Sequence, residues 1–95
     1  MIFVIIGHDS PDGQEKRKLH RQAHLDRMDP LDKAGKVLLA GPFTDRAGSL
    51  IVLDMASLEE VQAFLKDDPY VTQGVFNRYE IHPFMQVFPN DKGNP

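Results

Sequence analysis

The hydrophobic pattern of the chain predicts four β-strands, because four short segments carry apolar residues in continuous or alternating runs. These segments are residues 2–8, 37–40, 49–55 and 75–84. In the first and third segments both faces are apolar, and strands of this kind are covered on both sides in folded proteins. Helices can cover one side of the sheet. In a chain of only 95 residues, we expect a second subunit to cover the other side.

Two segments have the periodicity of helices. The first spans residues 14–35, and Pro30 within it predicts a kink or a break because proline removes a backbone donor. The second begins at Ser57, which can form a reciprocal capping box with Glu60. It ends before Pro69, because proline disfavours helical geometry at the residue that precedes it.

The elements follow one another in the order β-α-β-β-α-β, which is the order of the ferredoxin-like fold. We therefore predict an α+β domain over residues 1–88, with an antiparallel sheet and both helices on one face. Residues 89–95 are polar and rich in Pro, Gly and Asn, and they are expected to form a loose tail. The uncovered sheet face is too apolar for water, which predicts a homodimer with two such sheets packed face to face.

The first helix carries two histidines, His20 and His24, four residues apart. A helix turns about 100° per residue, so the two rings lie one above the other on one face. The apolar residues expected on or beside that face are Leu19, Ala23, Leu31 and Ala34. We therefore predict that both histidines lie at the edge of the core, within the stripe that packs on the sheet.

Composition and charge exclude several classes of function. The net charge is −3, so neither nucleic acid nor an anionic membrane is expected as a partner. The basic residues that do cluster are interpreted as a solvated helix face; they are Lys16, Arg17, Lys18 and Arg21. The chain has no cysteine, which excludes disulfides, thiolate catalysis and cysteine-ligated zinc. The apolar opening is too short for a signal peptide or a membrane span, and we expect a cytoplasmic protein.

Four features, in their order and spacing, give the chain a resemblance to a known family. They are the apolar segment 1–7, the helical segment Arg21-Gln22-Ala23-His24-Leu25, the link 35–42, and residues 67–75 before a last strand that ends in Ile81-His82-Pro83-Phe84. Over about residues 1–88 the sequence resembles the YCII-related family, the YciI-like small dimeric α/β-barrel proteins. The resemblance implies a ferredoxin-like fold, a homodimer with larger assemblies left open, and a small-molecule ligand.

The resemblance also implies a candidate site. A histidine and an aspartate have been proposed as a catalytic pair in this family, and the matching positions here are His24 and Asp68. Members of the family include a dehydrochlorinase that acts on chlorinated hydroxyhydroquinones. The loop at residues 43–48 is shorter than in some relatives, and it borders the cleft, so it bears on which substrate is bound.

The histidine and the aspartate have two interpretations. A carboxylate bonded to one imidazole nitrogen raises the basicity of the other, which would make His24 a general base. Alternatively, Asp68 is a turn residue before Pro69, and His24 is a core histidine with its hydrogen bonds satisfied. The spacing of His20 and His24 also matches two metal ligands on a helix, but Arg21 stands where glutamate is usual, and a cation disfavours a bound metal ion. We expect no metal and no cofactor.

The sequence offers four further candidates for ligand binding: Tyr70, Arg21, Gly41 and Pro42. Tyr70 is either a hydrogen-bond donor in the cleft or a core aromatic residue with its hydroxyl at the rim. Arg21 either pairs with an anionic substrate or is a solvated helix residue, and the Gly-Pro pair is expected to shape the turn after the second strand. The other two histidines, His8 and His82, are expected to be surface residues at strand ends.

Three functions are compatible with these residues. The first is a small enzyme of acid/base type, a lyase (including dehydrochlorination) or an isomerase, acting on an aromatic or dicarbonyl metabolite in a cleft between the helices and the sheet. The second is a non-catalytic ligand-binding or accessory dimer that holds a small ligand in the same cleft. The third, by fold analogy alone, is a cofactor-free monooxygenase.

Overall fold

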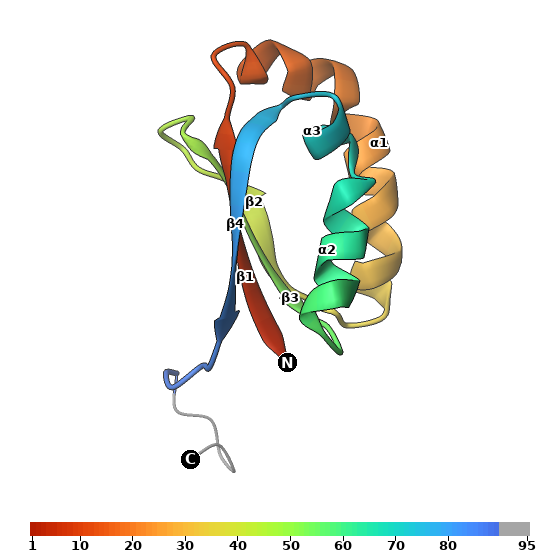
Figure 1. Ribbon diagram of the computed structural model, residues 1–95, viewed down its shortest axis with the longest axis vertical. Coiled ribbons are helices and arrows are strands. Elements are labelled where there is room, and N and C mark those ends of the chain that lie inside the picture. The colour runs from red at the N-terminus through yellow and green to blue at the C-terminus, as the bar shows by residue number, and fades with distance from the viewer. Residues whose placement is uncertain (90–95) are drawn as a thin grey trace.

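The computed structural model describes residues 1–89, which form one antiparallel sheet with helices packed on one of its faces (Figure 1). The predicted order of elements is confirmed, with one short additional helix before the last strand. The elements are β1 (Ile2–Asp9), α1 (Gly13–Lys33), β2 (Val37–Pro42), β3 (Gly48–Asp54), α2 (Leu58–Lys66), α3 (Pro69–Thr72) and β4 (Phe76–Phe84).

The sheet has the strand order β2-β3-β1-β4, and every neighbouring pair is antiparallel. β1 lies in the centre, where Val4 is opposite Val52 of β3 on one side and His82 of β4 on the other. Each helical connection therefore crosses over one strand, which is the split βαβ arrangement of the ferredoxin-like fold. The predicted fold class is confirmed.

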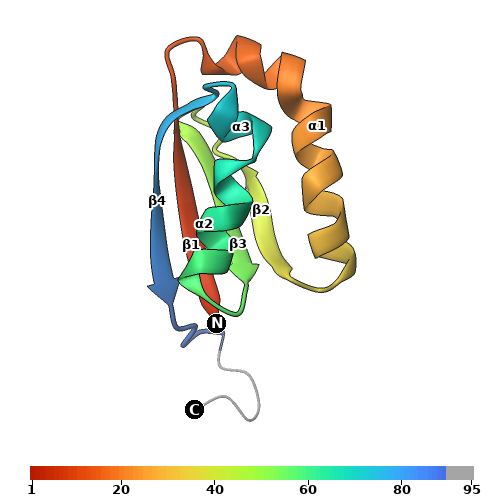
Figure 2. The ribbon, with the colours of Figure 1, turned by 45° about the vertical axis from the view of Figure 1, so that its right-hand side comes forward.

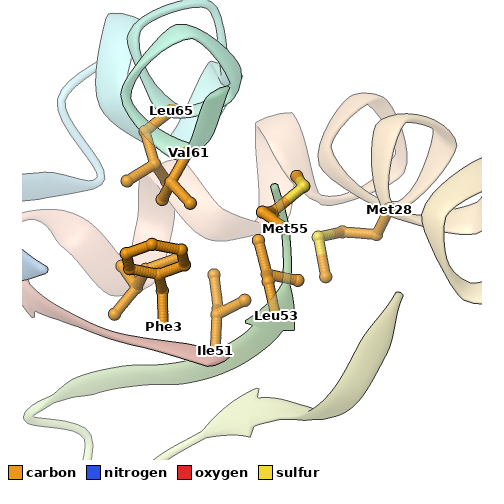
Figure 3. Packing of buried hydrophobic residues seen from close by; sticks show 8 residues of the cluster. Phe3, Met28, Ile51, Leu53, Met55, Val61 and Leu65 are labelled. Carbon is orange, nitrogen blue, oxygen red and sulfur yellow. The ribbon is translucent and has the colours of Figure 1, made fainter. Parts of the chain in front are cut away.

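The core lies between the sheet and the helix layer, mainly beneath α2. Figure 2 shows α2 over the central strands, whereas α1 lies toward the β2 edge. Residues from β1 and β3 point toward Val61 and Leu65 of α2, and Met28 of α1 joins them beside Met55 (Figure 3). The fully buried members include Ile5, Leu53 and Val61, each 0% exposed. Burial of each such side chain contributes about 1.5–3 kcal/mol.

The inward face of α1 differs from the predicted one. Leu19 is 77% exposed, and Ala23 and Ala34 are exposed as well, so the prediction that they face the sheet is wrong. The buried residues of the helix are Gly13, Arg17 and Met28. His20, His24 and Leu31 of the predicted stripe are partly buried, and Leu31 packs against the core. The inward stripe therefore overlaps the predicted one in part, and its first half is polar.

A break at Pro30, one of the two predicted outcomes, is not observed, since α1 continues to Lys33. Proline removes one helical hydrogen bond, which leaves the carbonyl four residues earlier without its donor. That residue, Asp26, is exposed, as is Pro30, so water can satisfy the carbonyl. The Pro30 carbonyl itself accepts from the amide of Ala34 at 3.1 Å.

The opposite face of the sheet carries apolar residues that no helix covers. Leu39 is 60% and Phe84 53% exposed, and they line a groove of about 430 Å³ together with Ile2, Val4, Leu50, Val52 and Phe88. Of the predicted tail, all but Pro89 lies outside the described residues. Within residues 1–89, none of the helices has both the length and the apolarity needed to cross a bilayer.

Candidate active site

A cavity of about 330 Å³ lies between α1 and the sheet, at the place where the inward face of the helix is polar. Its floor comes from β2 and β3, and Tyr70 of α3 contributes to its wall. Its lining includes Arg17, Arg21, His24, Gly41, Pro42 and Tyr70. Five of the six predicted site residues therefore line one cavity. The sixth, Asp68, lies behind His24.

His24 and Asp68 form a direct hydrogen bond, with 2.9 Å between Nδ1 and Oδ2. The Asp68 side chain is 2% and the His24 side chain 12% exposed. Since an ionised carboxylate only accepts hydrogen bonds, Nδ1 is the donor in this arrangement, and in the neutral form of the ring Nε2 carries the lone pair. No hydrogen bond within residues 1–89 engages Nε2, so this nitrogen remains for a ligand.

Local structure explains why an aspartate stands at position 68. It is the N-cap of α3, and its Oδ2 atom accepts from the amide of Tyr70 at 3.0 Å. Pro69 occupies the first helical position, where its missing N–H costs nothing. The two interpretations of Asp68 are thus compatible, because one carboxylate both caps the turn and holds the His24 ring.

Arg27 fixes the second oxygen of the same carboxylate. Its Nη1 atom donates to Oδ1 of Asp68 at 3.1 Å and to the carbonyl of Phe64 at 2.8 Å. The guanidinium also lies 4.3 Å from the centre of the Phe64 ring. With both oxygens bonded, the Asp68 carboxylate is held in one orientation. Its hydrogen bond to Nδ1 then fixes the orientation of the His24 ring.

Tyr70 packs its ring flat against His24. The ring centroids are 4.0 Å apart and the planes differ by 7°, while Phe76 meets the Tyr70 ring edge-on at 5.7 Å. Tyr70 is 4% exposed. The stacking restricts turning of the imidazole out of its plane, and the bond to Asp68 fixes its rotation within the plane, so His24 is preorganised.

Arg17 lines the cavity but is absent from the sequence-based candidates. It was interpreted as part of a solvated helix face, but it is 5% exposed, so that interpretation is wrong for this residue. Its Nε and Nη2 atoms donate to the two oxygens of Asp9 at 2.8 and 2.7 Å, and Nη2 also donates to Ser49 Oγ at 2.9 Å. The hydrogen bond to Asp9 is the main cause that raises the pKa of Arg17 above its ordinary value. A sign of this role was present in the spacing, since positions 17, 21 and 24 share one helix face.

The remaining histidines do not line this cavity. His20 is partly buried one turn before His24. His8 and His82 lie on the outer sheet face, where their Nε2 atoms bond the two oxygens of Glu80 at 2.7 and 3.0 Å. These bonds, first that of His82 and then that of His8, lower the pKa of Glu80 to about 2. The two histidines lie on neighbouring strands of the predicted fold, and the structure adds that they share the carboxylate of Glu80.

Comparison with known proteins finds similar small proteins in bacteria. Protein YciI of Escherichia coli is 37% identical over 98 residues, a match that covers 93% of this chain and 100% of that protein. An uncharacterized protein of Haemophilus influenzae is 32% identical over 101 residues, with the same coverage.

Solved structures agree with the fold. The 5-chloro-2-hydroxyhydroquinone dehydrochlorinase of Burkholderia phenoliruptrix, in complex with 2,5-dihydroxybenzoquinone, has a TM-score of 0.84 and 27% identity, and the match covers 96% of this chain and 100% of that one. A hypothetical protein from Pyrococcus horikoshii has a TM-score of 0.52 at 10% identity, with 96% and 99% covered, which shows likeness of fold alone. Residues 1–85 match the model of the YCII-related domain, and the chain therefore belongs to the YCII-related family.

Proposed function

We propose that this protein is a small-molecule enzyme that moves protons on a hydroxylated aromatic or dicarbonyl ligand. His24 is the general base and Asp68 orients it. The observation that carries the proposal is the 2.9 Å bond between His24 Nδ1 and Asp68 Oδ2 at the wall of a cavity. A ring nitrogen with a lone pair beside such a cavity is the arrangement that general base catalysis needs.

Each residue has a separate task in this proposal. His24 Nε2 takes a proton from a ligand hydroxyl group, and the Asp68 carboxylate stabilises the imidazolium that forms. Arg27 acts as a positioning residue, because it touches Asp68 and not the cavity. Tyr70 supports the ring of His24 and is a candidate donor to the ligand. Gly41 borders the cavity through its backbone, since its pairing with the outward-facing Leu50 directs its Cβ position to the other sheet face.

Dehydrochlorination is the reaction class that we favour, because the dehydrochlorinase is similar in fold and sequence over its whole length. Loss of HCl from a chlorinated hydroxyhydroquinone balances without an added oxidant. One hydroxyl proton moves to the ring carbon that bears chlorine, and chloride leaves with the bonding electron pair. A second hydroxyl proton is released, and the ring ends as a hydroxyquinone. Both proton movements fall within the chemistry of an imidazole base, and neither needs a cofactor.

The test is chloride release from 5-chloro-2-hydroxyhydroquinone in oxygen-free buffer. We expect turnover by the wild type and a loss of about 100-fold or more in His24→Gln, the size typical of a lost general base. His20→Gln is the matched control, because it removes a histidine one turn away that does not line the cavity, and it should keep activity. Equal rates in His24→Gln and the wild type would refute the catalytic role. Absence of turnover in the wild type would favour the ligand-binding alternative.

We also propose that two copies pack through the outer sheet face. The support is the row of apolar side chains that line the groove on that face, among them Leu39 and Phe84. A second copy brings the same apolar surface and so matches it in extent. Light scattering should give the mass of a dimer for the wild type and of a monomer for Leu39→Glu. Leu19→Glu is the control, since Leu19 is exposed on the outer side of α1; a monomeric wild type would refute the proposal.

A further inference from the structure

The cavity wall formed by α1 is basic. Arg17, Arg21 and His24 follow one another at spacings of four and three residues, which places them on one face of the helix, and all three line the cavity. None of the residues that line it is acidic. The nearby carboxylates of Asp9 and Asp68 stand behind this wall, each bonded to a basic side chain.

Arg17 has hydrogen-bonding capacity left over. Its three hydrogen bonds use Nε and Nη2, two of them to Asp9 and one to Ser49. Nη1 makes none of these three bonds, although, besides Asp9, Tyr70 lies close enough to the guanidinium to help raise the pKa of Arg17. Within residues 1–89, every fully buried side-chain nitrogen or oxygen has a partner, so Nη1 must be accessible. Since Arg17 lines the cavity, this amino group is a fixed donor available to a ligand.

Arg21 adds a charge that the protein does not balance. It is exposed at the cavity, and no carboxylate of the described residues lies within ion-pair distance of it. Arg17, by contrast, is balanced by Asp9, with 2.7 Å between Nη2 and Oδ1. The cavity therefore keeps one uncompensated positive charge on the same helix face as His24.

We propose that Arg17 and Arg21 form an oxyanion-binding pair, and that the ligand of this cavity carries an ionised hydroxyl group conjugated with a carbonyl group. The fixed Nη1 of Arg17 binds the anionic oxygen, and Arg21 sets the preference for a negative ligand. Charge-assisted hydrogen bonds of this kind are about twice as strong as neutral ones. The proposal rests on the proposed function only in taking this cavity as the ligand site.

Two matched quinones test the proposal by calorimetric titration. The first, 2,5-dihydroxy-1,4-benzoquinone, is a vinylogous acid that is ionised at neutral pH, and its 2,5-dimethoxy analogue is neutral. We expect the wild type to bind the anionic quinone at least about tenfold more tightly than the neutral one, with affinity that falls as salt is added. Equal binding of the two, or no binding of the anionic quinone at about 1 mM, would overturn the proposal.

Variants assign the preference to particular residues. Arg21→Gln should weaken binding of the anionic quinone about threefold to fivefold and leave the neutral one unchanged. Lys18→Gln is the matched control, because it removes one positive charge from the same helix at an exposed position outside the cavity lining. If both variants lose affinity equally, the effect is general electrostatics and the assignment of Arg21 is wrong.

Arg17→Lys should weaken binding of the anionic quinone about tenfold or more, because lysine cannot bond Asp9 twice and also reach the ligand. Since this side chain is buried, the variant can fail to fold. A crystal structure of the wild type with the anionic quinone then decides the point. We expect a ligand oxygen within about 3.2 Å of Arg17 Nη1, and a quinone whose oxygens contact neither arginine would refute the pair.

Failure here is distinguishable from failure of the proposed catalysis. If binding is charge-selective but no His24-dependent turnover is found, the oxyanion-binding pair is supported and the proposed catalysis is refuted. Turnover that depends on His24, together with equal binding of both quinones, would do the reverse. The binding titration needs no reaction, so the two outcomes are measured independently.

Discussion

Replacement of Asp68 by asparagine separates the two tasks of this residue. Asparagine is equal in size and caps helices as well as aspartate does, so its oxygen should remain on the amide of Tyr70. The amide nitrogen then faces Arg27, and two donors oppose each other where Oδ1 accepted at 3.1 Å. The hydrogen bond to His24 Nδ1, 2.9 Å long in the wild type, is kept in the variant. Its acceptor is then a neutral amide oxygen and no longer a carboxylate.

The expected cost follows from these bonds. One charge-assisted hydrogen bond is lost, at about 1.5–3 kcal/mol, and a second is weakened toward the value of a neutral bond. Arg27 recovers part of the loss, because its side chain is 29% exposed and keeps its bond to the Phe64 carbonyl. We expect Asp68→Asn to lower the free energy of unfolding by about 2–3 kcal/mol. For a domain of this size, that lowers the melting temperature by roughly 10–20 °C.

Asp67→Asn is the matched control for this measurement. Asp67 is the adjacent residue, carries the same charge and is exposed. Urea titration of both variants should leave Asp67→Asn within about 0.5 kcal/mol of the wild type. If the two variants are equally stable, the buried contacts of Asp68 do not contribute as the structure indicates. Chloride release by the same variants would show whether activity falls together with the lost Asp68 charge.

Three further predictions concern stability away from that pair. Arg17→Met leaves Asp9 buried without its cation and should lower the free energy of unfolding by about 3–5 kcal/mol. Urea titration should show that adding Asp9→Asn restores much of this stability, and no recovery would contradict the pairing. Gly48→Ala should destabilise strongly, because a Cβ there would collide with a backbone carbonyl of β1, whereas Gly41→Ala meets no atom within 4 Å and should leave the melting temperature unchanged. Glu80, with its pKa lowered to about 2 from an ordinary 4.5, contributes stability above pH 4.5 that is lost as the pH falls through about 2. The stability gap between the wild type and Glu80→Gln should therefore close over that range, and a constant gap would refute this.

The fold was predictable because the apolar residues of the strands follow a regular pattern from one residue to the next. Phe3 and Ile5 face the helices while Ile2 and Val4 face the other way, and a pattern of period two is enough to define both faces. Half of the predicted capping box at Ser57 is present, since its Oγ accepts from the amide of Glu60 at 3.2 Å. Among the described residues, no bond joins the Ser57 amide to the Glu60 carboxylate. Short-range chemistry and simple periodicity together determine the order of the elements.

The polar face of α1 was not predictable in the same way. Periodicity marks a helix face as buried when its residues are apolar, so a face that is buried but polar looks solvated. Arg17 is such a case, because what buries it is Asp9, at the end of a strand, and Ser49, on another strand. Both partners are brought to it only by the completed sheet. Leu19 is an apolar residue beside the helix face of the two histidines, which predicts an inward position, yet it is 77% exposed.

The location of the cavity follows from this polar face. Where α1 carries Met28, it closes onto the core beside Met55 and Leu53, and burial of apolar area holds it there. Toward the N-terminus of the helix, arginines replace apolar residues, and a charged side chain enters a protein interior only with partners of its own. The ion pair of Arg17 with Asp9, with 2.7 Å between Nη2 and Oδ1, holds this half of the helix to the sheet. It does not fill the space beside it. The arginines at inward positions of this half of α1 therefore have two effects. They prevent close hydrophobic packing, which leaves the cavity, and they supply the charges that line it.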